Sequence, residues 1–198
     1  MKPINILKTG AAIMAIALFT ACQPAKNQND DTVEVAKDQN DEALDNRDEE
    51  KDADFIVNAV AANLAEIKLA QLALTKSTDV GVKKMAAMLE IDHTKVLKEL
   101  QGYATKKGIS IPVAETNDAT EDRNDLAEKD GKEFNEKWCS LLKDKHEKTI
   151  NMFEKRIDKT EDMELKDWVA TTLPGLKKHL EMLEEHEDRT KIGLNNNK

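Results

Sequence analysis

Apolar residues recur at every third or fourth position in four long blocks of the chain, over residues 53–76, 80–107, 132–159 and 160–188. This spacing is the period of an amphipathic α-helix. In chain order the four stripes are Ile56, Val60, Asn63, Ile67, Ala70 and Leu74; Met85, Leu89, His93, Val96, Leu100 and Tyr103; Phe134, Trp138, Leu142, His146, Thr149, Phe153 and Ile157; and Leu165, Val169, Leu173, Leu176, His179, Leu180 and Leu183. The pattern predicts four long helices that share one core.

The breaks between the blocks differ in length. Residues 77–79 form a short break rich in helix-capping side chains, and Gly108 ends the second block. Residues 109–130 form a longer polar connection, for which we expect one short helix near residues 121–129, and Pro174 predicts a kink in the last helix. Two short turns and one long connection describe an all-α, up-down-up-down four-helix bundle.

The N-terminal segment has a different pattern. Lys2 and Lys8 flank an apolar run that is too short to span a bilayer as a mature helix but is typical of a signal-peptide core. The run ends in Leu18-Phe19-Thr20-Ala21-Cys22, which resembles a bacterial lipobox. This resemblance implies cleavage before Cys22 and lipid modification of its sulfur. We therefore expect an outer-membrane lipoprotein, held in the cell envelope by its lipid anchor, with its domain in the periplasm or at the cell surface.

Charge is concentrated between the signal peptide and the first block. Residues 23–54 hold twelve Asp and Glu against four Lys and Arg, and the remainder of the chain is nearly balanced. So polar a composition predicts a flexible tether. We therefore divide the chain into a signal peptide (residues 1–21), an acidic disordered tether (22–53), a bundle domain (54–189) and a disordered tail (190–198). No stripe of basic and aromatic residues is present, so nucleic acid is not an expected partner.

Cys139 is the one cysteine that remains once Cys22 is acylated. It follows Trp138 in a helical pattern, and we expect it to act as a small buried hydrophobic residue.

Three of the four histidines lie on the apolar stripes of three different helices. Glu66 and His93 are about 11 and 15 residues from the first short turn, and His146 and His179 are about 14 and 18 residues from the second. If both turns lie at the same end of the bundle, these four side chains meet near mid-height. Imidazoles and a carboxylate from separate helices form a ligand set for iron, manganese or zinc. The alternative is that each histidine is an ordinary hydrogen-bonded core residue.

Other polar residues lie near these four in the sequence. Glu90 is three residues before His93, while Asp92 and Glu147 adjoin His93 and His146. Glu90, Asp92 and Glu147 are therefore candidates for additional ligands or for residues that orient the ligands. The alternative is that Asp92 and Glu147 lie on a solvated face. His186 lies in a charged stretch, and we expect it to face solvent.

Several ordered motifs extend this pattern: Asn63-Leu-Ala-Glu66, Asp92-His93-Thr94-Lys95, Lys106-Lys107-Gly108, Asp144-Lys145-His146-Glu147-Lys148 and Thr172-Leu173-Pro174-x-Leu176-x-x-His179-Leu180. Together they resemble domain-of-unknown-function family 4142. The resemblance implies an exported bacterial protein with a ferritin-like bundle, and it implies no reaction. Its polar motif positions correspond to Glu66, Asp92, His93, His146, Glu147 and His179. Helix four carries Leu176 where a di-iron site would need a second Glu.

Two hypotheses for function follow. The first is a non-enzymatic, membrane-tethered module of the cell envelope that acts in stress tolerance or interaction, with the protein partner and self-association left open. The alternative is a ferritin-like protein that binds iron, manganese or zinc through Glu66, His93, His146 and His179. A hydrolase is not expected, because no nucleophile-and-base arrangement with suitable spacing is visible.

Overall fold

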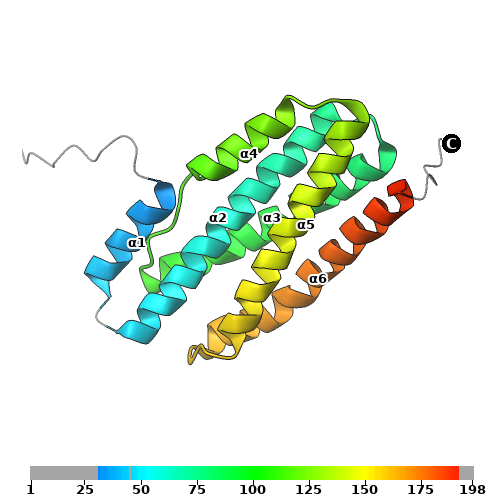
Figure 1. The fold of residues 1–198 in the computed structure, drawn as a ribbon. Coiled ribbons are helices and arrows are strands. Elements are labelled where there is room, and N and C mark those ends of the chain that lie inside the picture. The colour runs from blue at the N-terminus through cyan, green and yellow to red at the C-terminus, as the bar shows by residue number, and fades with distance from the viewer. Residues whose placement is uncertain (1–30, 45, 192–198) are drawn as a thin grey trace, which may run out of the picture.

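The computed structural model describes residues 31–44 and 46–191, with side chains up to residue 189. Within these residues the chain forms six helices and no strand, so the predicted all-α class is confirmed (Figure 1). The helices are α1 (Thr32–Ala43), α2 (Arg47–Lys76), α3 (Val80–Lys107), α4 (Asn117–Ala127), α5 (Gly131–Ile157) and α6 (Met163–Lys191). The predicted signal peptide, Cys22 and residues 192–198 of the predicted tail lie outside the described residues.

Local sequence determines where the long helices begin and end. The Asp79 carboxylate accepts a hydrogen bond from the backbone N–H of Val82 at 2.9 Å and so caps the start of α3. Gly108 ends α3 with a φ of 70°, a conformation in which glycine carries no steric penalty. The predicted second helix therefore matches α3 at both ends.

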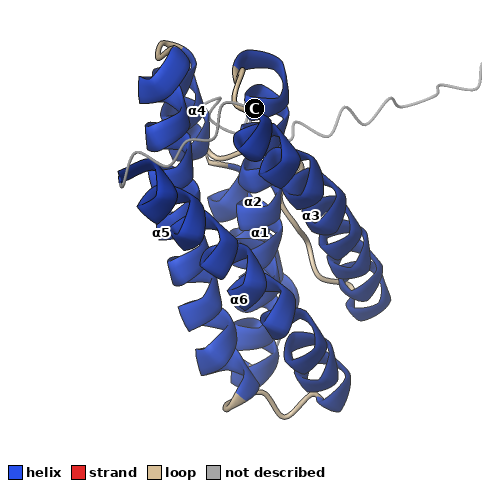
Figure 2. Cartoon of the chain, turned by 90° about the vertical axis from the view of Figure 1, so that its right-hand side faces the viewer, coloured by secondary structure: helices blue, strands red, loops and turns tan. Residues whose placement is uncertain are grey.

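The four long helices form two tightly packed hairpins, α2 with α3 and α5 with α6 (Figures 1 and 2). At one end of the bundle, Trp138 on α5 donates a hydrogen bond from Nε1 to the carbonyl of Leu69 on α2 at 2.9 Å. At the other end, Arg156 Nε donates to Asp52 Oδ1 at 2.6 Å. The start of α5 thus lies beside the end of α2, and these two helices are antiparallel.

The direction of α5 corrects the predicted topology. Both α3 and α5 run opposite to α2, so the order is up-down-down-up, and the two short turns lie at opposite ends of the bundle. The long connection explains the difference, because it carries α4 along the bundle before α5 begins (Figure 1). A crossover of this kind is one of the connections that four-helix bundles use.

The N-terminal boundary of the domain also differs from the prediction. Helix α1 packs on α2 through the buried Ala36. The Asn40 amide donates to the carbonyl of Ser110 at 3.0 Å and accepts from its backbone N–H at 2.7 Å. Residues 32–43 and 47–53, expected to be tether, are therefore helical, and the packed domain begins near Thr32 rather than at residue 54.

The core is divided into two apolar clusters along the bundle axis. One contains Leu69, Leu89, Phe134, Trp138, Leu142 and Leu183, and the other contains Phe55, Leu100, Phe153, Leu165 and Val169. Cys139 belongs to the first cluster, as predicted, and burial raises its thiol pKa to about 12. Among the described residues, α2 alone is long and apolar enough to cross a membrane, but most of its apolar stretch is buried in this core.

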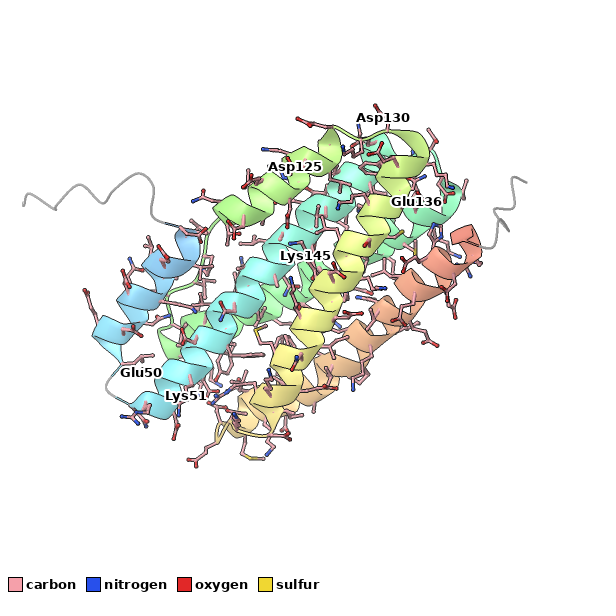
Figure 3. All side chains as sticks on the ribbon, in the orientation of Figure 1. Glu50, Lys51, Asp125, Asp130, Glu136 and Lys145 are labelled. Atoms are coloured by element: carbon pink, nitrogen blue, oxygen red, sulfur yellow. The ribbon has the colours of Figure 1, made fainter. Side chains whose placement is uncertain are left out.

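Charged side chains cover the outside of the bundle. Figure 3 shows the labelled Asp125, Asp130 and Glu136 projecting from the surface, and all three are exposed. Lys145 on α5 forms an ion pair with Asp122 on α4, with Nζ 2.9 Å from Oδ2. The short connecting helix is in this way held against the bundle.

Candidate metal centre

A buried polar group lies between the two apolar clusters. Each long helix contributes one member: Glu66 from α2, His93 from α3, His146 from α5 and His179 from α6, which together we call the His/Glu cluster. Their exposed fractions are 1%, 2%, 0% and 5%, respectively. They meet even though the turns lie at opposite ends, because their heights agree at the end of the bundle where α2 and α6 end and α3 and α5 begin. Glu66, His93, His146 and His179 lie 10, 13, 15 and 12 residues from that end, respectively.

The three imidazoles form a nearly equilateral triangle. Their ring centroids are 5.3 Å apart for His93 and His146 and 5.4 Å apart for the other two pairs. One ring nitrogen from each histidine lies within 4.8 Å of the other two. His146 Nε2 and His179 Nδ1 are 3.4 Å apart. The Glu66 Oε2 atom is 2.9 Å from His93 Nε2 and 3.6 Å from His146 Nε2.

The protonation of His93 follows from its neighbour Asn63. The Asn63 amide Nδ2 donates to the backbone carbonyl of Ala59 at 2.7 Å, which orients the amide and leaves Oδ1 as an acceptor. His93 Nδ1 lies 2.9 Å from that Oδ1 and must therefore carry the proton. In the neutral ring, Nε2 then presents a lone pair toward Glu66.

The tautomers of the other two histidines also follow from their hydrogen-bond acceptors. His146 Nδ1 lies 2.9 Å from the carbonyl of Leu142, which can only accept, so this nitrogen is protonated and Nε2 carries the lone pair. His179 Nε2 lies 3.0 Å from Asp92 Oδ2, so it donates to the carboxylate and leaves the lone pair on Nδ1. All three lone pairs consequently point into the cluster.

The cluster contains the unsatisfied polar atoms of the described core. Among buried side-chain atoms in the described residues, those without a hydrogen-bond partner are Glu66 Oε1, Glu66 Oε2 and His93 Nε2. Although His93 Nε2 and Glu66 Oε2 are only 2.9 Å apart, they are not aligned as a hydrogen bond. An unpaired buried carboxylate is costly, so this arrangement calls for a cation.

Burial favours the neutral form of two of the imidazoles, and nearby positive charge favours the ionised form of Glu66. Burial lowers the pKa of His146, and burial lowers that of His179 to about 4. Burial alone would raise the pKa of Glu66, but the positive charge that His146 and His93 carry when protonated outweighs burial and lowers the pKa to about 2. A bound cation would supply positive charge at the same place while the imidazoles are neutral. Neutral imidazoles and ionised carboxylates are the protonation states in which these side chains bind metal ions.

A single metal ion fits the spacing of these atoms better than a proton does. Two ligands about 2.1 Å from a tetrahedral zinc ion lie about 3.4 Å apart, which is close to the separations within the cluster. A proton shared by His93 and Glu66 would leave the lone pairs of His146 and His179 facing each other at 3.4 Å without a hydrogen between them. A metal ion would instead accept an electron pair from each member of the His/Glu cluster.

Other candidate residues lie outside this group. Glu90 Oε1 instead accepts from Gln71 Nε2 at 2.9 Å, and Glu147 is exposed. Asp92 contacts the cluster only through His179 and is therefore placed to orient that ring.

The polar neighbour whose role the sequence did not reveal is Asn63. It lies on the predicted core stripe of α2, but its partner is fixed only by packing.

The expectation that His186 faces solvent is wrong. Its exposed fraction is 7%, and it packs beside Gly81, where an added Cβ would lie 3.2 Å from its ring. Burial lowers its pKa. His186 follows Leu183 by three residues and so shares its buried helix face, a signal that the surrounding charges obscured.

Comparison with known families gives one finding. The family model described as "Domain of unknown function (DUF4142)" matches residues 34–185, which include α2 through most of α6 and all members of the His/Glu cluster. No curated protein and no solved structure matches the chain.

Proposed function

Because this chain belongs to the DUF4142 family, a domain of unknown function, we propose its function from the geometry of the core: the bundle binds one divalent transition-metal ion at the His/Glu cluster. His93, His146 and His179 supply three imidazole nitrogens. Glu66 supplies the carboxylate as the fourth ligand and balances part of the ion's charge.

One observation carries this proposal. Each histidine has its outer N–H taken by an acceptor, so that all three lone pairs point into a cluster whose buried carboxylate has no hydrogen-bond donor. The acceptors are Asn63 Oδ1, the Leu142 carbonyl and Asp92 Oδ2. Such outer partners fix the tautomer of metal-binding histidines and strengthen their basicity. A set of independent core histidines would not need this common orientation.

The ligand types narrow the choice of ion. Three imidazoles and one carboxylate suit zinc, iron or manganese, and no cysteine belongs to the cluster to favour a soft ion. Since Glu90 pairs with Gln71 and Leu176 is apolar, the described core supplies ligands for one ion rather than for a di-iron pair. Binding of a single ion would join the α2–α3 hairpin to the α5–α6 hairpin.

The proposal is tested by loading the full chain, purified in detergent, with Zn²⁺ and measuring metal content by elemental analysis. We expect one Zn²⁺ per chain, and a large loss in His146→Gln and Glu66→Gln. Glu147→Gln is the matched control, because this exposed carboxylate adjoins His146 without entering the cluster. Circular dichroism verifies that each variant is folded. Metal content no higher in the native chain than in His146→Gln would refute the proposal.

We also propose that this metal-binding bundle is anchored in the cell envelope through a lipid on Cys22. Its support is the sequence of Lys2, Lys8, the apolar run and the lipobox-like residues before Cys22. Mass spectrometry of the mature N-terminal peptide tests it. Diacylglyceryl-modified Cys22 is expected in the native chain and should be absent from Cys22→Ser. A mature protein that begins at another residue would contradict it.

A further inference from the structure

Part of the His/Glu cluster reaches a surface depression between α3 and α6. His93 and His179 line it together with Asp92, Glu99, Thr171 and Gly175. The other members, Glu66 and His146, do not line it and are almost completely buried. Among the described residues, the cluster therefore comes closest to solvent at the seam between α3 and α6.

The seam between α2 and α5 is covered. Helix α4 packs against both of these helices and buries Leu126 against them. Figure 1 shows α4 lying along α2, and the ion pair of Lys145 with Asp122 holds it to α5. No described helix covers the seam between α3 and α6, which lie side by side in Figure 2 and make a smaller contact than either hairpin.

Helix α6 is weakened where it borders the depression. Pro174 has no N–H, so the carbonyl of Ala170 loses its helical hydrogen bond. The hydroxyls of Thr171 and Thr172 bond back to carbonyls four residues earlier, a contact that often bends helices. Gly175 adds backbone freedom. These features lie within the nine residues before His179, so a local opening of α6 there would expose the His179 ring.

Asp92 places a negative charge at the mouth of this route. Its side chain is 49% exposed, yet Oδ2 lies 3.0 Å from His179 Nε2. The other carboxylate in the depression, Glu99, already accepts from Trp168 Nε1 at 3.0 Å and lies 3.9 Å from Lys95 Nζ. Asp92 is thus the more available anionic group, and it touches a member of the cluster directly.

We propose that the metal ion enters and leaves the His/Glu cluster through the depression between α3 and α6, with Asp92 as the first side chain that the hydrated cation meets. The ion then passes the His179 ring and binds Nδ1, the nitrogen of His179 that faces the cluster. This inference rests on the proposed function and adds a route and a transfer residue to it.

The test measures rates as well as affinity. Co²⁺ uptake by the metal-free full chain in detergent is followed by stopped-flow absorbance, and release is followed after addition of excess EDTA. Gly175→Leu is the first variant, because a Cβ at this exposed position meets nothing within 4 Å and a longer side chain would narrow the depression. Gly102→Leu is the matched control on α3, since its Cβ is also unobstructed and it does not line the depression.

We expect Gly175→Leu to slow uptake and release several-fold by the same factor, with an unchanged dissociation constant, while Gly102→Leu behaves as the native chain does. Equal rates in Gly175→Leu and the native chain would overturn the route while leaving the proposed function intact. A native chain that takes up no Co²⁺ would instead overturn the proposed function itself.

A second variant, Asp92→Asn, tests the charge of Asp92 while the size of the side chain stays nearly the same. In Asp92→Asn the amide oxygen can still accept the Nε2 proton of His179, but the charge is removed. We expect slower uptake at low ionic strength and a smaller difference from the native chain as salt is added, because salt screens exposed charges. Glu99→Gln is the control and should change uptake less. An Asp92→Asn uptake rate equal to the native rate at low salt would exclude Asp92 from the route.

Discussion

Asn63 on α2 accepts the Nδ1 proton of His93 on α3 across 2.9 Å, and this bond determines which nitrogen of His93 faces Glu66. The amide cannot reverse its role, because its Nδ2 group donates to the carbonyl of Ala59. Asn63 is not itself a member of the His/Glu cluster, yet it controls the orientation of the His93 imidazole.

The first prediction concerns this bond. Replacing Asn63 with Ala removes the acceptor, so His93 is free to turn or to change tautomer. We expect metal affinity to fall by roughly 10- to 100-fold, with still one ion bound per chain at saturation. Competition titration with a chromogenic zinc chelator measures this change.

Gln71→Ala is the control for Asn63→Ala, because Gln71 lies on the same helix but bonds to Glu90 outside the cluster. Its affinity should match that of the native chain. An unchanged affinity in Asn63→Ala would show that His93 is oriented by packing alone.

The second prediction concerns the number of ions bound. Glu90 lies three residues before His93, the spacing found in di-iron proteins, but it bonds to Gln71 and does not join the cluster. We expect Glu90→Gln to retain one ion per chain and native affinity. Titration calorimetry measures both quantities, and a second site lost on this substitution would contradict the single-ion geometry.

The third prediction concerns pH in the metal-free protein. Burial lowers the pKa of His179 from 6.5 to about 4. Between these values the unfolded chain binds more protons than the folded chain, so the free energy of unfolding falls as pH drops from about 6.5 to about 4. His179 contributes up to about 3 kcal/mol of this loss.

Urea unfolding at several pH values between 7.5 and 4, with EDTA present, measures that dependence. His179→Gln should show a shallower dependence, because one titrating imidazole is removed. Identical slopes for His179→Gln and the native chain would mean that His179 does not resist protonation in the folded state.

The fourth prediction tests whether α1 belongs to the domain. Asn40→Ala breaks both hydrogen bonds to the Ser110 backbone and leaves those groups without their partner. We expect a loss of about 1–3 kcal/mol in the free energy of unfolding and faster amide exchange in α1. Gln39→Ala removes an exposed neighbour and should have a small effect. Equal effects of the two substitutions would show that α1 is not packed on the bundle.

Periodicity predicted the four long helices because the spacing of apolar residues is a local property of each helix. It carried no information on helix direction, which depends on where α4 takes the chain before Gly131. The prediction that residues 32–43 and 47–53 belong to a flexible tether was wrong for a related reason. Its average composition is polar, but Ala36 and Asn40 lie four residues apart and share one buried helix face.

The candidate site was partly visible in the sequence. Three histidines on three apolar stripes, with Glu66 on a fourth helix, indicated convergence, although the assumption that both short turns lie at the same end of the bundle was wrong. The roles of Asn63 and the Leu142 carbonyl depend on which atom faces which, and this is decided only when the helices pack. The same limit applied to His186, whose burial depends on the space left by Gly81.

The most direct test of the account is X-ray absorption spectroscopy at the metal edge of the Zn²⁺-loaded full chain. It reports the atoms bound to the ion. We expect a first shell of nitrogen and oxygen with outer scattering from three imidazoles. A first shell of oxygen ligands without imidazole scattering would contradict the proposal that His93, His146 and His179 hold the ion.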